Sequence, residues 1–208
     1  PLRDSPRISI MISAIGASFL IENLAIVLFD ARPKAFPVPD FFASTFVLGD
    51  VHVSTVSVVI PIVTAIILGL LLWVVYRTKT GMAMRAVSTD IDAARLMAID
   101  VNRIVSITFA IGSALAAVGG IMFALKYPRL EPLMGIMPGL KAFVAAVLGG
   151  IGIIPGAMMG GVILGVVEAL VSGFLSSTFR DAAAFTILII ILLIKPTGLM
   201  GKNETEKV

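Results

Sequence analysis

Long apolar runs constrain this sequence more than any other feature. Three of them, Ile8–Phe29, Val56–Tyr76 and Ile104–Leu125, each hold the ~20 residues that a helix needs to cross a hydrocarbon core about 30 Å thick. Only 14% of all residues are charged and 58% are hydrophobic, whereas a soluble domain has about 25% charged residues. The pattern predicts an all-α, polytopic integral membrane protein.

The apolar region 138–175 is too long for one crossing and too rich in glycine for two ordinary ones. Pro155 divides it, because proline removes a helix hydrogen-bond donor and clashes with the preceding turn. We expect a short helix over Leu140–Leu148, a glycine-rich turn, and a full crossing from Gly156 to about Val171. A last crossing is expected over Ala182–Ile194. The predicted fold is therefore a helical bundle with one short or broken helix.

A polar stretch follows the first apolar run. Its prolines, Pro33, Pro37 and Pro39, exclude a continuous helix there. The segment "FVLGDVHVS" alternates weakly around Gly49 and Asp50, which form a turn signal. We expect a small β-hairpin at this position.

The distribution of basic residues orients the chain, because Lys and Arg gather in cytoplasmic loops. Segments 1–7, 77–103 and 195–208 hold ten of the sixteen: Arg3, Arg7, Arg77, Lys79, Arg85, Arg95, Arg103, Lys195, Lys202 and Lys207. Placing these segments in the cytoplasm requires an even number of crossings between Arg103 and Lys195. Four fit if the short helix crosses. A re-entrant short helix would leave three crossings and put the tail outside, which fits the charges less well.

Residues for ATP hydrolysis or metal binding are missing from the sequence. The nearest string to a P-loop, "PTGLMGKN", lacks the first Gly and the final Ser or Thr of that motif. Cys is absent, and His52 is the only histidine, so the chain offers no thiolate site and no histidine cluster. We expect a protein without catalytic residues, metal or cofactor of its own.

Small residues recur at helical spacing in the apolar regions. Such spacing lets two helix backbones approach closely, although these residues could also line a translocation path. The candidates are Gly152, Gly156, Gly160, Gly161 and Gly165, with Gly112, Ala116, Gly119 and Gly120 in an earlier run.

Three charged residues fall inside apolar runs, where a central charge costs roughly 2.5–3.5 kcal/mol. They are Glu22, Lys141 and Glu168. They could line a polar path, pair with one another, or simply make interhelical hydrogen bonds. We expect Arg180 and Asp181, at the start of the last run, to form a helix cap and a surface pair.

A charged, helix-forming segment, "STDIDAARLMAIDV" (88–101), lies between two apolar runs. Thr89 to Asp92 resembles a capping box, and acids in the first turn suit the helix dipole. Ala93, Leu96 and Met97 then share one face. Such a helix could receive force from outside the membrane, or it could rest at the lipid interface.

Several motifs together resemble the permease subunits of branched-chain amino acid ABC importers, the LivH family. They are "GMAMRAVSTDIDAARLMAIDVNRI", "GLKAFVAAVLGGIGIIPGAMMGG" and "KPTGLMG". The cytoplasmic element is also similar to that of vitamin B12 and ribose permeases. The resemblance implies that the helix from Asp90 to Ala98 docks on an ATPase subunit. The residues that match the family element are Asp92, Ala93, Ala94, Arg95, Leu96, Met97 and Ala98, and Asp90 is a further coupling candidate. Glycine usually stands where this chain has Ala98.

The resemblance also implies a complex in the bacterial inner membrane. It would contain a second permease subunit, two ATPase subunits that bind the ATP, and a periplasmic substrate-binding protein. Residues 1–208 would form a single transmembrane permease domain, with 77–103 as its coupling loop. Family members are longer at the N-terminus, so we expect this chain to match their C-terminal portion. A sugar or amide permease, an ATP-independent carrier and an intramembrane enzyme are the alternative readings.

Overall fold

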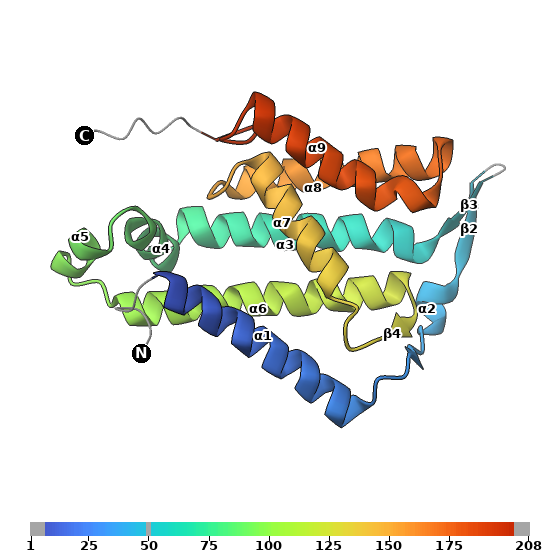
Figure 1. The fold of residues 1–208 in the computed structure, drawn as a ribbon, viewed down its shortest axis with the longest axis horizontal. Helices are drawn as coiled ribbons and strands as arrows, with labels where there is room; N and C mark the ends of the chain where they lie inside the picture. Colours follow the sequence, from blue (N-terminus) through green and yellow to red (C-terminus); the bar gives the residue numbers. More distant parts are fainter. Residues whose placement is uncertain (1–6, 49–50, 202–208) are drawn as a thin grey trace. The chain divides into compact units, whose positions relative to one another are not determined.

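The computed structural model describes residues 7–48 and 51–201. They fall into two compact units, which divide between Pro132 and Leu133. Figure 1 shows the elements in chain order; most of them are helices, and the strands are short. The all-α fold expected from the apolar runs is confirmed.

Among the described residues, five helical stretches are long and apolar enough to cross a membrane. They are α1 (Arg7–Phe29), α3 (Thr55–Arg77), α6 (Val101–Lys126), α8 (Ile154–Phe174) and the stretch Ser177–Ile194, where the 3-10 turn η1 (Ser177–Phe179) leads into α9 (Arg180–Ile194). The predicted short helix is present as α7 (Ile136–Gly149), which has 14 residues. At about 1.5 Å per residue, its axis is shorter than the hydrocarbon core.

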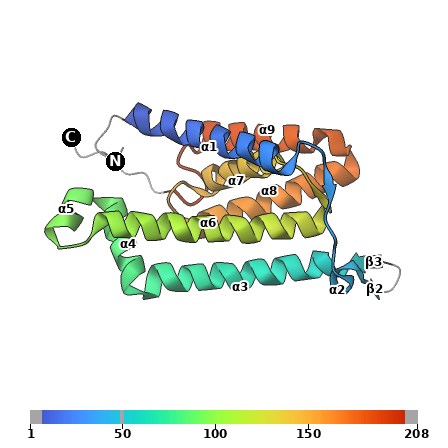
Figure 2. The same cartoon turned by 90° about the horizontal axis from the view of Figure 1, so that it is seen from below.

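In the first unit, α3 and α6 are in contact, and Figure 2 shows them side by side. The helix α2 (Asp40–Ala43) and the strands β2 (Thr45–Leu48) and β3 (Val51–Ser54) lie at one end of α3. The strands pair antiparallel, with Thr45 opposite Ser54, so the predicted hairpin is confirmed. Its predicted turn residues, Gly49 and Asp50, lie outside the described residues.

A second strand pair was not predicted from the sequence. β1 (Lys34–Ala35) follows α1, β4 (Arg129–Leu130) follows α6, and the two pair antiparallel. The amide of Phe36 also donates a 3.2 Å hydrogen bond to the Pro128 carbonyl. This pairing ties together the segments that leave α1 and α6.

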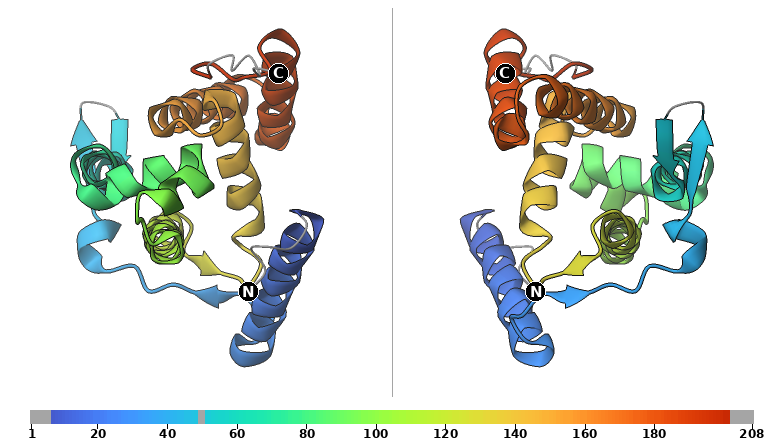
Figure 3. Two further views of the ribbon diagram at one scale, coloured as in Figure 1. Left: turned by 90° about the vertical axis from the view of Figure 1, so that its left-hand side faces the viewer. Right: turned by 90° about the vertical axis from the view of Figure 1, so that its right-hand side faces the viewer.

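The second unit consists of α7, α8 and α9, which pack against one another (Figure 3). Val144 and Ala145 of α7, Leu164 of α8 and Ala184 of α9 form its buried core, and partly buried Phe185 and Leu188 pack against them. Pro155 lies in the first turn of α8, where a missing amide proton costs nothing. The expected division of this apolar region at Pro155 is confirmed.

Gly156 and Gly160 allow α8 to lie directly against α7. A Cβ atom at Gly156 would collide with the carbonyl of Gly149, and one at Gly160 with the carbonyl of Ala145. The close approach predicted from the glycine spacing is therefore present at these two positions. A Cβ at Gly161 would make only ordinary contact, and one at Gly165 would meet nothing within 4 Å.

Gly152 does not belong to that helical face, which corrects the sequence prediction. It has φ 87° and precedes α8, in the turn after α7. The four-residue spacing from Gly152 to Gly156 reflects a turn that needs glycine, since φ in this range is unfavourable for other residues. On α6, Cβ atoms at Gly112, Gly119 and Gly120 would meet no described atom within 4 Å.

Candidate functional site

The loop between α3 and α6 is itself helical. It contains α4 (Lys79–Thr89) and α5 (Ile91–Leu96), at the end of α3 away from the hairpin. The Thr78 hydroxyl accepts a 3.0 Å hydrogen bond from the Gly81 amide and caps α4. Gly81 lies so close to the last turn of α3 that a Cβ would collide with the Val74 and Val75 carbonyls. Thr78, three residues before Gly81, was the available signal for this unpredicted helix.

The N-cap of α5 is Asp90, not Thr89 as the capping-box pattern suggested. One Asp90 carboxylate oxygen accepts hydrogen bonds from the amides of Asp92 (2.8 Å) and Ala93 (3.0 Å). The Thr89 hydroxyl instead donates to the Arg85 carbonyl at the end of α4. Asp92 pairs with Arg95 at 3.2 Å on the exposed side of the helix. Asp90 thus fixes where α5 begins.

The C-terminal end of α5 is closed by a Schellman motif. Ala98 has φ 57°, its amide donates to the Arg95 carbonyl, and the Ile99 amide donates to the Ala94 carbonyl. This geometry normally selects glycine at the left-handed position. Here Ala98 adopts the left-handed conformation, so α5 ends in the same motif although the residue is not glycine.

The predicted apolar face of α5, with Ala93, Leu96 and Met97, is exposed, but Ala94 does not belong to the exposed surface. Ala94, which we expected to meet a partner, is only 3% exposed and packs with Val87 of α4 and Val101 of α6. Leu96 is 89% exposed and Met97 is 77% exposed. The apolar atoms that α5 offers to a partner are therefore those of Leu96 and Met97, with Ala94 holding the helix to its own loop.

A cluster of three charged side chains joins the helices of the second unit. The Lys141 ammonium lies 3.0 Å from a Glu168 carboxylate oxygen and 2.8 Å from an Asp181 carboxylate oxygen. Lys141 and Glu168 are largely buried, whereas Asp181 is half exposed. The pairing of Lys141 with Glu168 was one of the sequence alternatives, and it is the one observed.

Asp181 joins this cluster instead of capping α9, which corrects its predicted role. Phe179 is the N-cap of α9 and makes no side-chain capping hydrogen bond. Arg180 donates a 2.9 Å hydrogen bond to the Ser172 hydroxyl of α8, so the predicted surface pair between Arg180 and Asp181 is also absent. The third intramembrane charge, Glu22, accepts a hydrogen bond from Ser18 one turn earlier in α1.

The "KPTGLMG" segment folds back onto the end of α7. The amides of Leu199 and Met200 donate to the carbonyls of Leu148 (2.9 Å) and Gly149 (3.0 Å). Gly198, with φ 79°, is so close to Gly150 that a Cβ atom would collide with its backbone. This segment satisfies carbonyl groups that the end of a helix leaves free, a role that the sequence did not reveal.

Within the described part of the chain, no group of three or more His, Asp or Glu side chains could hold a metal ion. Three local arrangements stand out. They are the capped helix α5 with its exposed apolar side chains, the ion cluster around Lys141, and the backbone hydrogen bonds from Leu199 and Met200 to the end of α7. None of them arranges a nucleophile beside a base.

Sequence comparisons agree with this architecture. The family model described as branched-chain amino acid transport system / permease component matches residues 3–195. The high-affinity branched-chain amino acid transport system permease protein LivH of Escherichia coli K12 is 42% identical over 214 residues, which cover 100% of this chain and 68% of that protein. The corresponding protein BraD of Pseudomonas aeruginosa is 40% identical over 213 residues, covering 100% of this chain and 69% of BraD.

A more distant relative belongs to a different import system. The autoinducer 2 import system permease protein LsrC of Enterobacter sp. is 32% identical over 129 residues, which cover 59% of this chain and 38% of LsrC. No solved structure matches the chain.

Proposed function

Because the chain belongs to the permease family of branched-chain amino acid transport systems, we propose that it forms the membrane-spanning part of an ATP-driven importer of these amino acids. The observation that carries this proposal is identity of 40–42% to two high-affinity permeases over the whole chain. The five apolar helical stretches supply the multi-pass membrane body that such a permease needs.

The proposed complex sits in the inner membrane. It contains a second permease subunit, two ATPase subunits and a periplasmic substrate-binding protein. ATP is bound by the ATPase subunits, and this chain contributes transport rather than catalysis. The sequence supports this division of labour, because it lacks a P-loop.

The proposed orientation places α4, α5 and the C-terminal tail in the cytoplasm and residues 30–54 in the periplasm. The positive-inside rule supports it. The orientation also requires α7 to cross, because α6, α8 and α9 alone would leave an odd number of crossings between Arg103 and Lys195.

Coupling is proposed to run through α5. When ATP closes the ATPase dimer, the ATPase surface that holds Leu96 and Met97 moves, and α5 follows it. Ala94 transmits the movement to α4 and α6, because it is packed between Val87 and Val101. The permease is thereby biased between inward-facing and outward-facing states.

The likeness to LsrC supports a second candidate, an importer for a small sugar-like molecule, at lower identity and coverage. Uptake by the purified complex in proteoliposomes separates the two. We expect ATP-dependent accumulation of labelled leucine, isoleucine and valine, which unlabelled ribose does not inhibit. Uptake of ribose or autoinducer 2 without uptake of leucine would contradict the proposal.

A further inference from the structure

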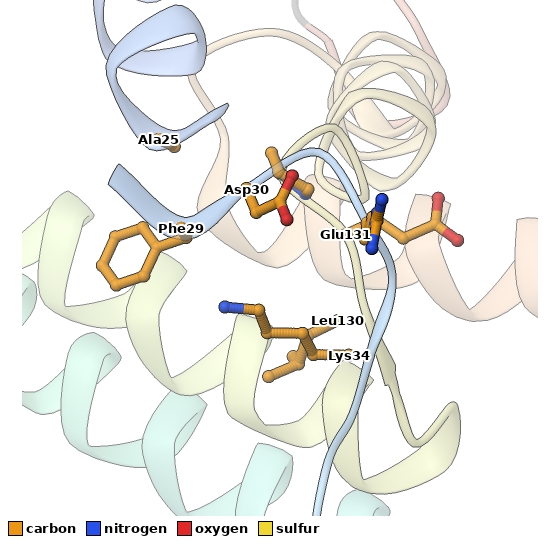
Figure 4. A pocket seen from close by; sticks show the side chains of 8 residues that line it. Ala25, Phe29, Asp30, Lys34, Leu130 and Glu131 are labelled. Atoms are coloured by element: carbon orange, nitrogen blue, oxygen red, sulfur yellow. The ribbon is translucent and has the colours of Figure 1, made fainter. Parts of the chain in front are cut away.

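A cavity of about 210 Å³ lies in the first unit, between the end of α1 and the segment that follows α6. Figure 4 shows the side chains around it. Phe29 and Leu130 supply apolar wall, and Asp30, Arg32, Lys34 and Glu131 supply two negative and two positive charges. We propose that this cavity is an outer subsite that binds a free aliphatic amino acid as its zwitterion. The inference rests on the proposed function.

The balance of charge selects the class of ligand. A site with one sign of charge would favour an anion or a cation. Because Arg129 already pairs with Glu131, the cavity offers one carboxylate, Asp30, and two cations, Arg32 and Lys34, which suit a molecule that carries both signs. An aliphatic amino acid also has an apolar side chain, for which Phe29 and Leu130 form the wall. Small-molecule sites commonly combine apolar walls with a few placed polar groups in this way.

The two cations of the cavity are available to a ligand. Among the described residues, neither Arg32 nor Lys34 forms an ion pair, and the pairing of Arg129 with Glu131 occupies one of the two acids. In Figure 4 the Lys34 amine points toward the side of the cavity where Phe29 lies, and the Glu131 carboxylate points the other way. Arg32 and Lys34 would therefore take the carboxylate of the amino acid.

Asp30 would take the ammonium group. It ends α1 with φ 71°, and its carboxylate accepts only the amide of Ala31, at 2.7 Å, among the described residues. The pairing of β1 with β4 places Lys34 opposite Leu130, so it fixes the position of this cation relative to the apolar wall of the cavity.

The site can be tested by protection of a single cysteine, because the chain contains none. Leu130→Cys places a thiol in the cavity wall, and Phe46→Cys places one on the exposed hairpin of the same unit. The assembled complex is reconstituted in phosphatidylcholine and phosphatidylglycerol, and the rate of thiol modification on this chain is measured with and without leucine.

We expect saturating leucine to slow modification at position 130 by about fivefold or more and to leave position 46 unchanged. Isopentylamine and 4-methylpentanoate, which each carry only one of the two charges, should not protect. In the Leu130→Cys background, Asp30→Asn and Lys34→Gln should each raise the half-protecting leucine concentration about tenfold. Lys126→Gln, which removes a cation that does not line the cavity, should not raise it.

Three outcomes would overturn the subsite. They are no protection in a complex that still imports leucine, protection by the binding protein irrespective of leucine, and protection only when phosphatidylethanolamine, a lipid whose headgroup carries a primary ammonium, is present. The first outcome leaves the proposed function intact. Conversely, protection by leucine in a complex that imports no leucine would refute the proposed function but would still support the subsite.

Discussion

The amide of Ile99 donates a 3.1 Å hydrogen bond to the carbonyl of Ala94, and both side chains pack in the same small cluster. This relationship closes α5 and holds it against α4 and α6. It requires Ala98, between them in the chain, to adopt a left-handed conformation. A residue with a Cβ atom is strained in that conformation.

Replacing Ala98 with glycine should therefore strengthen the end of α5. We expect Ala98→Gly to stabilise the closed loop by up to about 1 kcal/mol, because glycine adopts positive φ without steric cost. Slower hydrogen exchange of the α5 amides in the purified complex would show this. Ala93→Gly, in the first turn of α5, is the matched control and should speed exchange, since glycine within a helix costs up to about 1 kcal/mol relative to alanine. Faster exchange in both variants would contradict the assigned cap.

The ion cluster around Lys141 should contribute to stability. Lys141→Met would leave two carboxylates facing each other without a cation, and we expect a loss of about 3 kcal/mol. Asp181→Asn should cost less than about 1 kcal/mol, because that carboxylate is half exposed to solvent. The melting temperatures of the purified variants in lipid nanodiscs measure both effects. An unchanged melting temperature with abolished uptake would instead support a role for Lys141 in a polar pathway.

Gly160 and Gly165 lie on the same helix, α8, but only Gly160 contacts α7, so their substitution should have different effects. Gly160→Ala should destabilise the second unit by about 1–3 kcal/mol, because its methyl group would overlap the Ala145 carbonyl. Gly165→Ala should change stability by less than about 0.5 kcal/mol, since a methyl group there meets open space. Recovery of the assembled complex and its melting temperature are the measurements. Equal recovery of the two variants would show that α8 does not pack through Gly160.

Membrane topology depends on whether the short helix α7 crosses. If it does, four crossings separate residues 88 and 205, and both lie on the cytoplasmic side. Single cysteines at Ser88, Phe46 and Thr205 can be labelled with an impermeant reagent in intact spheroplasts. We expect labelling at position 46 alone. Labelling at position 205 together with position 46 would show that α7 is re-entrant.

The membrane-spanning helices could be predicted from the sequence because their signal is local. A run such as Val56–Tyr76 is expected to be helical in lipid, because a helix satisfies its own backbone hydrogen bonds. The helix observed there, α3, extends one residue beyond the run at each end. Pro155 likewise marked a helix start by its own chemistry. Such features depend on residues adjacent in the chain.

The candidate sites were harder to predict, because their partners are distant in sequence. Asp181 had the local pattern of a helix cap, yet Lys141 lies 2.8 Å away on another helix. Gly152 had the spacing of a packing face, yet it serves a turn. The capping-box pattern began at Thr89, yet the Thr89 hydroxyl donates to the Arg85 carbonyl of α4, and Asp90 caps α5 instead.

The burial of Ala94 decides which residue of α5 can be used to test coupling. The sequence offered it as a contact residue, but an aspartate there would place a charge among Val87, Val101 and Ile99 and would disrupt the loop itself. Loss of transport in Ala94→Asp would therefore carry no information about the ATPase surface. Leu96 projects outward and is the informative position.

The most direct test of coupling through α5 is a photo-crosslink from position 96. A benzoylphenylalanine residue replaces Leu96 in the assembled complex in native membranes, and the crosslinked partner is identified by mass spectrometry. We expect a crosslink to the ATPase subunit, with a yield that changes when ATP is bound. A crosslink to lipid, with none to the ATPase in either state, would contradict it and show that α5 rests at the membrane surface.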